Sequence, residues 1–535
     1  MTTPGSTYSA ADVLGEAWQA ALGTPPAGPD ADFFASGGDS LLAIRMLSRL
    51  RQARVVSTTA DILRGRTFGG ILSRLEARGA EVAAAPVEEA GAGAVPLLPT
   101  QRRWIANGFA EPDHFSLGWI FDVPERTPDG RIVDTGAVEA AVLALVRRHE
   151  ALRTRYLLDG DGAPRAEVLP GVPDGVFAVV DVPGDELSGQ AVSGHAVSGD
   201  ELSKDSVSDV LRAGWRGHRL AEGRVLAARW LPAQRLLQLA LHHLTLDGFS
   251  VELLADDLEA LLTGAEPVAE PGTPRGQAQA VSTWLASAEA EQDAKAWAGQ
   301  NWQEVARVPA ELAGLGLLPS MDLVSAELDA RETAAAQRLA TEAGLTFESL
   351  VLAAAATAIM RRFGLPAVSV DTYHHGRDRL PGGPDITSGI GYFQANYPVV
   401  VTGGPGDWLE RAAAGFDRVP KNRFGFDALR FAGHPALTDL PGSGIRLNFR
   451  SRMSEINART SDWLPPSQTS AGGRRSPRQT EPYLLMLEAD QVGERFAFAI
   501  KYSRDHFTSQ TVEHLVRSTL ALLAGTAVVR DGVDA

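Results

Sequence analysis

Cysteine is absent from the 535 residues of this chain. Its absence excludes disulfide bridges, zinc or iron–sulfur sites built on thiolates, and any cysteine nucleophile. We expect no metal. A chain without cysteine is compatible with a reducing compartment.

An excess of basic residues is also missing, because 50 Lys and Arg stand against 66 Asp and Glu, giving a net charge of −16. Without a broad surface that neutralises phosphates, we expect no nucleic-acid partner. The longest apolar runs, 350–360 and 520–529, are shorter than the roughly 20 residues that span a bilayer. The first ten residues also lack the pattern of a secretory signal. We therefore expect a cytoplasmic protein without a membrane partner.

The composition is that of a globular protein, with 44% apolar and 22% charged residues. At roughly 100–200 residues per domain, the length predicts three or four folding units. Residues 1–78 are predicted to form a small helical domain, with helical spacing at 10–22, 41–50 and 68–75. Residues 79–95 are rich in Ala, Gly, Glu and Pro and predict a linker. A GDELS repeat at 184–188 and 199–203 predicts a duplicated surface loop.

Strands and helices alternate in the rest of the chain, which predicts an α/β fold. The predicted strands are 176–182, 236–244, 367–373 and 495–503. The predicted helices are 138–148, 250–262, 332–343, 347–361 and 509–523.

The segment DFFASGGDSL places Ser40 directly after a glycine-containing turn and before an apolar-striped helix. Taken alone, the pattern predicts a serine that caps a helix. Within a helical unit of some 70 residues, and with paired aromatics at Phe33 and Phe34, it resembles a peptidyl carrier protein. The resemblance implies a covalent 4′-phosphopantetheine arm on Ser40, attached by a phosphopantetheinyl transferase.

The segment HHLTLDG, residues 242–248, follows an apolar strand. A neutral imidazole there can accept a proton or orient a nucleophile. Adjacent residues of a strand point to opposite faces, so His242 and His243 are not expected to share a metal ion. We expect one of them to face a cavity and the other to face the core, while Gly248 allows a ligand to approach the backbone closely.

The pattern HHxxxDG resembles the condensation domains of non-ribosomal peptide synthetases. Further segments match motifs of that family in the same order, namely LLPTQRRWI, RHEALRT, IGYFQANYP and LNFR. The resemblance implies two chloramphenicol-acetyltransferase-like halves in a V shape, expected at 96–275 and 276–535. RGQAQAVSTW and PKNRFGFDALR depart from the family pattern, which affects the substrate side.

The activity implied by this resemblance is amide-bond formation between a donor acyl thioester and the amine of an acceptor aminoacyl thioester. His243 would be catalytic, as base or by positioning the amine, and a backbone N–H near Gly248 would stabilise the oxyanion. His242 and Asn448 are implied as active-site structural residues. Asp247 is expected to hold the loop through an arginine, for which the candidates are Arg148, Arg153 and Arg377.

The same resemblance implies partners. They are donor and acceptor aminoacyl or peptidyl thioesters, a downstream carrier domain and neighbouring synthetase modules, because no adenylation region is found in this sequence. The carrier precedes the condensation domain, and we expect it to be the donor side.

Two alternatives remain. An epimerisation domain shares the HHxxxDG loop, but its second base is a glutamate in EGHGRE, whereas YHHGRD places Tyr373 there. A non-catalytic, partner-recruiting domain usually loses the second histidine or the DG pair, and both are intact here.

Overall fold

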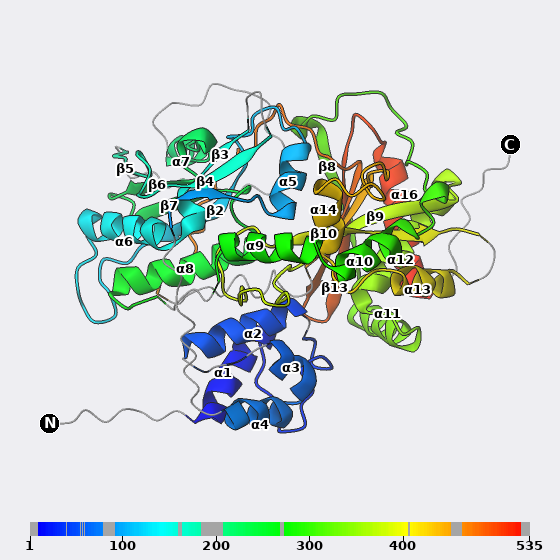
Figure 1. Cartoon of the computed structure of the whole chain (residues 1–535), viewed down its shortest axis with the longest axis horizontal. Helices are drawn as coiled ribbons and strands as arrows, with labels where there is room; N and C mark the ends of the chain where they lie inside the picture. The colour runs from blue at the N-terminus through cyan, green and yellow to red at the C-terminus, as the bar shows by residue number, and fades with distance from the viewer. Residues whose placement is uncertain are drawn as a thin grey trace.

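The structure is a computed structural model that describes residues 9–38, 40–53, 55, 57, 59–78, 91–158, 163–182, 207–267, 272–404, 407–450 and 463–525. It has three parts, which we call the helical unit (9–78), the first lobe (91–267) and the second lobe (272–525). The two lobes lie side by side, and the helical unit lies below them (Figure 1). The GDELS repeat and residues 79–90 of the expected linker lie outside the described residues.

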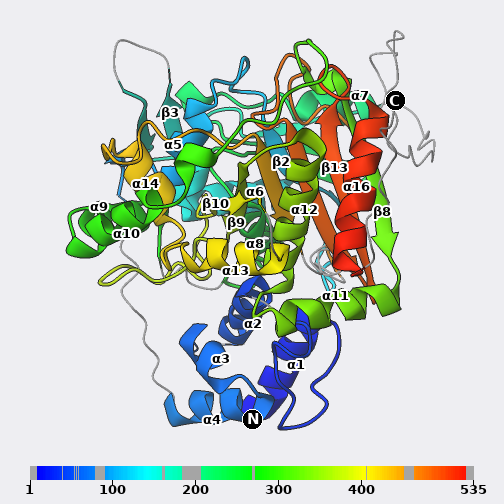
Figure 2. The same ribbon diagram turned by 90° about the vertical axis from the view of Figure 1, so that its right-hand side faces the viewer.

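The helical unit contains α1 (Ala10–Leu22), α2 (Ser40–Gln52), α3 (Thr59–Gly65) and α4 (Phe68–Arg78). Helix α1 begins at a capping box between Ser9 and Asp12 and ends at Gly23, whose φ of 75° gives the left-handed conformation that glycine adopts without strain. The core of the unit is built on Trp18, whose ring meets that of Phe33 edge to face at 5.3 Å. Helix α2 is the helix of this unit that faces the lobes (Figure 2).

The first lobe is built on two sheets. Strands β2 (Ser116–Asp122), β7 (Leu236–His242), β6 (Leu226–Leu231) and β5 (Phe177–Val179) form one in that order, and β1 (Gly93–Val95), β4 (Arg165–Val168) and β3 (Thr154–Leu157) form the other. Its helices are α5 (Pro99–Ala106), α6 (Thr135–Arg148), α7 (Val207–Gly214) and α8 (Gly248–Thr263). Every residue of β7 is buried, because β7 lies between two strands and carries apolar side chains on both faces.

The second lobe is built on a mixed six-stranded sheet. Its strands follow the order β10 (Ala395–Thr402), β9 (Ala367–His374), β11 (Ile445–Phe449), β12 (Leu485–Val492), β13 (Arg495–Ser503) and β8 (Met321–Leu328). Its helices are α9 (Pro274–Leu285), α10 (Ala288–Ala298), α11 (Ala330–Glu342), α12 (Phe347–Phe363), α13 (Trp408–Asp417), α14 (Gly425–Phe431) and α16 (Ser509–Leu523). All residues of α12 from Leu350 to Met360 are buried, as expected for the central helix of a lobe.

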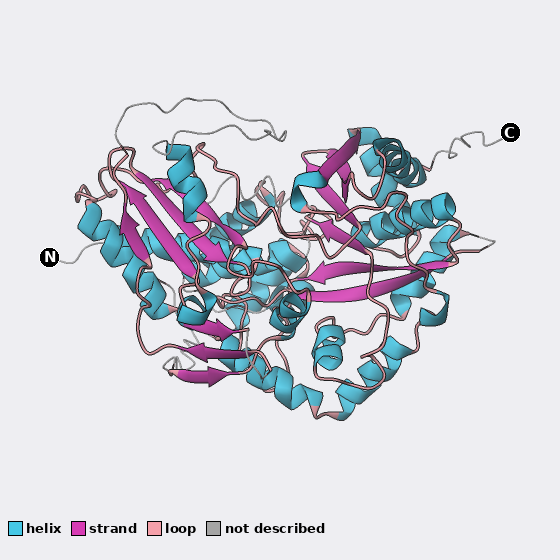
Figure 3. Ribbon diagram, turned by 90° about the horizontal axis from the view of Figure 1, so that it is seen from above, coloured by secondary structure: helices cyan, strands magenta, loops and turns pink. Residues whose placement is uncertain are grey.

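A segment of the second lobe crosses to the first. The backbone N–H of Ser467 donates to the carbonyl of Ile120, and that of Ser116 donates to the carbonyl of Arg474, both at 2.7 Å. The segment thereby covers the free edge of β2, which would otherwise present unpaired N–H and C=O groups. Seen from above, the strands of the two lobes stand on either side of a central region that the connecting segments cross (Figure 3).

The α/β class is thus confirmed, and the boundaries differ from expectation in three places. The expected linker ends earlier, because Gly93–Val95 forms strand β1 against β4. Helix α9 runs through the expected boundary at 275/276, since its Thr273 cap and Pro274 start the helix before that point. The crossing segment belongs by sequence to the expected second half, 276–535, but its backbone pairs with β2 of the first lobe. Among the described residues no single helix has the length and apolarity to cross a membrane, while α11 and α12, bent by 97°, meet that criterion only as a pair.

Candidate active site and attachment site

The HHxxxDG segment forms the turn between β7 and α8, where the two lobes meet. The turn is held by residues of the two earliest motifs in the lobe. The amide Nε2 of Gln101 donates to the carbonyl of Leu244 at 3.1 Å, and Oγ1 of Thr245 donates to the carbonyl of Ala151 at 2.9 Å. The turn is therefore fixed from two sides before any ligand binds, as preorganisation requires.

His243 is half-buried, and its Nδ1 lies 3.0 Å from the carbonyl oxygen of Leu246. Because a carbonyl oxygen only accepts, Nδ1 carries the proton and Nε2 carries a lone pair. The ring packs between Phe115 and Tyr392, with ring centroids 5.4 and 4.9 Å away. Burial lowers the pKa of His243 below its ordinary value of 6.5, which keeps the imidazole neutral and able to accept a proton near neutral pH.

His242 has the opposite character. It is fully buried, its Nε2 donates to the carbonyl of Pro112 at 2.7 Å, and its Nδ1 accepts from the N–H of Leu244 at 3.1 Å. Burial lowers the pKa of His242 to about 3, so the ring is neutral. Both nitrogens are engaged by the backbone, and His242 therefore supports the turn.

Asp247 is buried and caps α8, accepting from the N–H of Ser250 at 2.8 Å. Its oxygens also accept from Nη2 of Arg377 at 2.9 and 3.2 Å and from the N–H of Phe393 at 3.0 Å. Since α8 belongs to the first lobe and the other two partners to the second, this carboxylate joins the lobes beside His243. Gly248 follows as the exposed first residue of α8, in the turn whose N–H groups lack intrahelical partners.

Of the three arginine candidates, it is thus Arg377 that pairs with Asp247. The other two have partners of their own. Nε of Arg148 lies 3.6 Å from Oδ2 of Asp257, and Arg153 donates to the carbonyl of Leu169. Both arginines lie near the end of α6, and the sequence does not show which acceptor group each of them contacts. Expecting either of them at Asp247 is therefore wrong.

Asn448 lies on β11, half-buried, and its Nδ2 donates to Oε2 of Glu488 at 2.8 Å. Glu488 also pairs with Arg446 at 3.1 Å, and the guanidinium of Arg446 lies 5.5 Å from the ring of Tyr373. Burial raises the pKa of Tyr373, so its phenol stays protonated and can donate a hydrogen bond.

An ion-pair network that sequence reasoning missed also joins the lobes. Nε and Nη2 of Arg103 on α5 bind both oxygens of Asp427 on α14 at 2.7 and 2.6 Å, and Nη1 binds Asp371 on β9 at 2.9 Å. The fork geometry is that of a bidentate arginine–carboxylate pair. Arg103 lies in LLPTQRRWI and Asp427 lies in PKNRFGFDALR. The charged residue in each motif was the sequence feature that could have indicated this ion pair.

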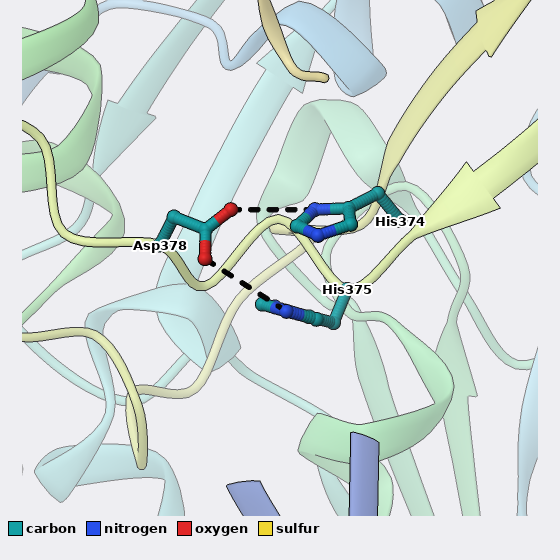
Figure 4. A group of neighbouring side chains, drawn as sticks. All are labelled: His374, His375 and Asp378. Carbon is teal, nitrogen blue, oxygen red and sulfur yellow. Dashed lines mark ion pairs between the residues drawn. The ribbon is translucent and has the colours of Figure 1, made fainter. Parts of the chain in front are cut away.

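His374, His375 and Asp378 form the group of side chains that most resembles a metal site among the described residues (Figure 4). Nδ1 of His374 and Nε2 of His375 lie 3.5 and 3.9 Å from the Asp378 carboxylate. However, the N–H of Arg377 donates to Nδ1 of His375 at 2.9 Å, which places the ring proton on Nε2. A neutral ligand histidine needs the reverse tautomer, so the group does not fit a metal ion.

Ser40 is the first residue of α2. Two glycines shape the turn before it. Gly37 has a φ of 93°, and a Cβ on Gly38 would meet the ring of Phe33 at 2.4 Å. The GG pair is thus required by the turn and by the aromatic core under it, which together present residue 40 at the start of the helix. Such an end offers backbone N–H groups to a phosphate.

Comparison with known proteins confirms both resemblances. A family model for the condensation domain matches residues 210–528, and one for the phosphopantetheine attachment site matches residues 12–75. A linear gramicidin synthase protein of Brevibacillus parabrevis is 25% identical over 95% of this chain, which spans 7% of that synthase protein. The helical unit is therefore a carrier domain, and the lobes form a condensation-type domain.

Two solved structures share the fold of the lobes. The epimerization domain from the third module of tyrocidine synthetase B has a TM-score of 0.64 and 21% identity, covering 81% of this chain and 97% of its own. The first condensation domain of the CDA synthetase has a TM-score of 0.55 and 21% identity, covering 82% and 98%. The two neighbours represent different reactions on one fold, so the choice between them depends on the site.

Proposed function

Because the chain belongs to the condensation-domain family, we propose that its lobes form an amide bond between a donor acyl group held on the carrier domain and the amine of an acceptor aminoacyl thioester. The donor arm is proposed to be a 4′-phosphopantetheine on Ser40, attached by a phosphopantetheinyl transferase. When bound, the arm supplies a thioester carbonyl. The acceptor is proposed to arrive on the carrier domain of a neighbouring module.

His243 is the residue that carries the proposal. Its Nε2 has a lone pair, because Nδ1 donates to the carbonyl of Leu246, and burial keeps the ring neutral. Nε2 can accept a hydrogen bond from the incoming amine, which orients the nitrogen lone pair toward the carbonyl. It can also take the proton that the nitrogen loses when the new C–N bond forms, and return it to the thiolate of the donor arm, which leaves as the C–S bond of the thioester breaks. The two roles use the same atom and the same tautomer.

The backbone N–H of Gly248 is the proposed hydrogen-bond donor to the thioester carbonyl oxygen, on which negative charge develops during the reaction. Its N–H belongs to the first turn of α8, and its position is open, since an added Cβ would meet nothing within 4 Å. N–H groups at a helix start stabilise negative charge, and a fixed donor of this kind costs no reorganisation during the reaction. Asp247 and Arg377 hold this turn in place across the lobes.

Epimerisation is the second candidate, favoured by the fold of the tyrocidine synthetase domain. Inversion at a carbon requires a second base that receives or returns a proton on the opposite face. The position where epimerisation domains place a glutamate holds Tyr373, and burial raises the pKa of this phenol. A protonated phenol does not act as that base, which supports condensation.

The deciding experiment loads the full chain with a donor aminoacyl arm and mixes it with a separately loaded acceptor carrier. We expect a dipeptide on the acceptor carrier, measured by mass spectrometry of the released product. An inverted donor without a dipeptide would establish epimerisation instead. Unchanged substrates on both carriers would favour a non-catalytic domain.

A further inference from the structure

Helix α2 of the carrier domain meets helix α8 of the first lobe through two charge pairs. Nη1 of Arg45 lies 3.8 Å from Oε2 of Glu252, and Nη1 of Arg49 lies 3.8 Å from Oδ2 of Asp256. On each helix the two charged residues are four positions apart, so they occupy one face and neighbouring turns. Between the helices, Ile44 is fully buried and belongs to the apolar core of the first lobe.

The pairing fixes the direction of the two helices. Arg45 pairs with Glu252 and Arg49 with Asp256, whereas antiparallel helices would exchange these partners. Both pairs have the same difference in residue number, so the helices run parallel and in register at this contact. Ser40 precedes Arg45 by five residues, and Asp247 precedes Glu252 by five residues, which is about 7.5 Å along an α-helix in each case. The parallel register therefore places Ser40 level with Asp247.

The register has a consequence for delivery. Asp247 caps α8 and follows the turn that contains His243, so the start of α2 lies at the same end of α8 as the catalytic turn. A carrier docked one turn further along, or in the reverse direction, would move Ser40 away from that end. Figures 1 and 2 both show α2 lying directly under the lobes.

The pairs are suited to selection more than to affinity. The side chains of Arg45 and Glu252 are only 8% and 11% exposed, and burial raises the pKa of Glu252 to about 7 even though Arg45 lowers it. The free-energy cost of removing this carboxylate from water is therefore larger than the stabilisation it gains from Arg45, as is common for buried ion pairs. Such pairs disfavour wrong partners strongly, because like charges placed together are costly.

We propose that the ion pairs Arg45–Glu252 and Arg49–Asp256 set the register in which this chain's own carrier domain docks on the first lobe. In this register Ser40 lies at the His243 end of α8. We call the two ion pairs the register code. The code selects carriers that have two basic residues one turn apart on the helix after the attachment serine. The delivery of a donor rests on the proposed function, whereas the docking register does not.

Charge reversal in the full chain tests the code. The variants are Arg45→Glu with Arg49→Glu, Glu252→Arg with Asp256→Arg, and all four changes together. Since the chain has no cysteine, spin labels on Glu76→Cys and Glu139→Cys, both at exposed positions, report the distance between the domains. Arg64→Glu, an exposed arginine on α3, is the matched control, and circular dichroism checks that each variant is folded.

We expect a narrow distance distribution for the unchanged chain and the control, and a broad one for each reversed pair. Amide formation from the chain's own loaded carrier should fall about tenfold or more with each reversal. Both readouts should recover when all four charges are exchanged. A narrow distribution after a single-sided reversal, or no recovery in the fourfold variant, would overturn the code. If the distances follow the charges while no variant forms amide, the docking stands and the proposed function falls.

Discussion

Nη2 of Arg377 lies 2.9 Å from Oδ1 of Asp247, and solvent reaches 0% and 4% of the two side chains. The carboxylate also caps α8, so one residue fixes the start of the helix, the turn that carries His243 and the contact between the lobes. The guanidinium is enclosed by the rings of Phe249 and Phe393, at 4.7 and 4.9 Å. The aspartate of the motif is thus a structural element of the site.

Removal of this carboxylate should destabilise the protein. Asp247→Ala leaves Arg377 charged in an interior that no longer pairs it, which costs about 3–5 kcal/mol of unfolding free energy. The measurement is urea unfolding followed by circular dichroism and by tryptophan fluorescence.

The matched control is Asp129→Ala, which breaks the exposed pair between Asp129 and Arg131. Exposed pairs contribute little to stability, so the control should unfold near the midpoint of the unchanged chain. An Asp247→Ala protein as stable as this control would show that the buried pair is unimportant.

The pH dependence of His243 follows from its surroundings. Because burial lowers its pKa below 6.5, the ring is neutral at pH 7 and becomes charged only as the pH falls below that ordinary value. Titration by NMR, with the resonance identified by its loss in His243→Gln, should give a midpoint below 6.5. The contribution of His243 to the rate should persist down to that midpoint. A midpoint at or above 6.5 would contradict the half-buried, neutral imidazole.

Attachment of the arm should depend on Ser40 alone. Incubation with coenzyme A and a phosphopantetheinyl transferase should add the mass of one arm to the chain, and Ser40→Ala should abolish the addition. The alanine variant should stay folded, because Ser40 is the first residue of α2 and not the residue before it that would cap the helix. Ser36→Ala, in the exposed turn before the glycines, serves as the control that is still modified. Mass addition to Ser40→Ala would refute the assignment.

The sequence predicted those parts of the site whose residues are close together in the chain. The strand expected at 236–244 is observed at Leu236–His242, and the helix expected at 250–262 begins two residues earlier, at Gly248. The start of α2 was expected after the glycines that precede Ser40, and it begins there. The tautomer of His243 was not predictable, because it depends on the position of one backbone carbonyl, that of Leu246.

Long-range pairing was the other part that the sequence did not predict. The sequence predicts that a carboxylate such as Asp247 pairs with a cation, but it does not show which arginine supplies the charge. The partner, Arg377, lies 130 positions away in the other lobe. The Arg103 to Asp427 pair, 324 positions apart, and the crossing segment were missed for the same reason. Local patterns specify elements, whereas the packing of two lobes decides which charges meet.

The most direct test of the account is the single-turnover rate of amide formation with His243→Ala. The full chain carries a loaded donor arm, a loaded acceptor carrier is added, and product is measured by rapid quench. We predict a rate lower by about 10²–10⁴-fold with unchanged loading. His434→Ala, a histidine paired with Glu291 on the second lobe, should match the unchanged chain. A His243→Ala rate within about twofold of the unchanged chain would contradict the role of His243 in this chemistry.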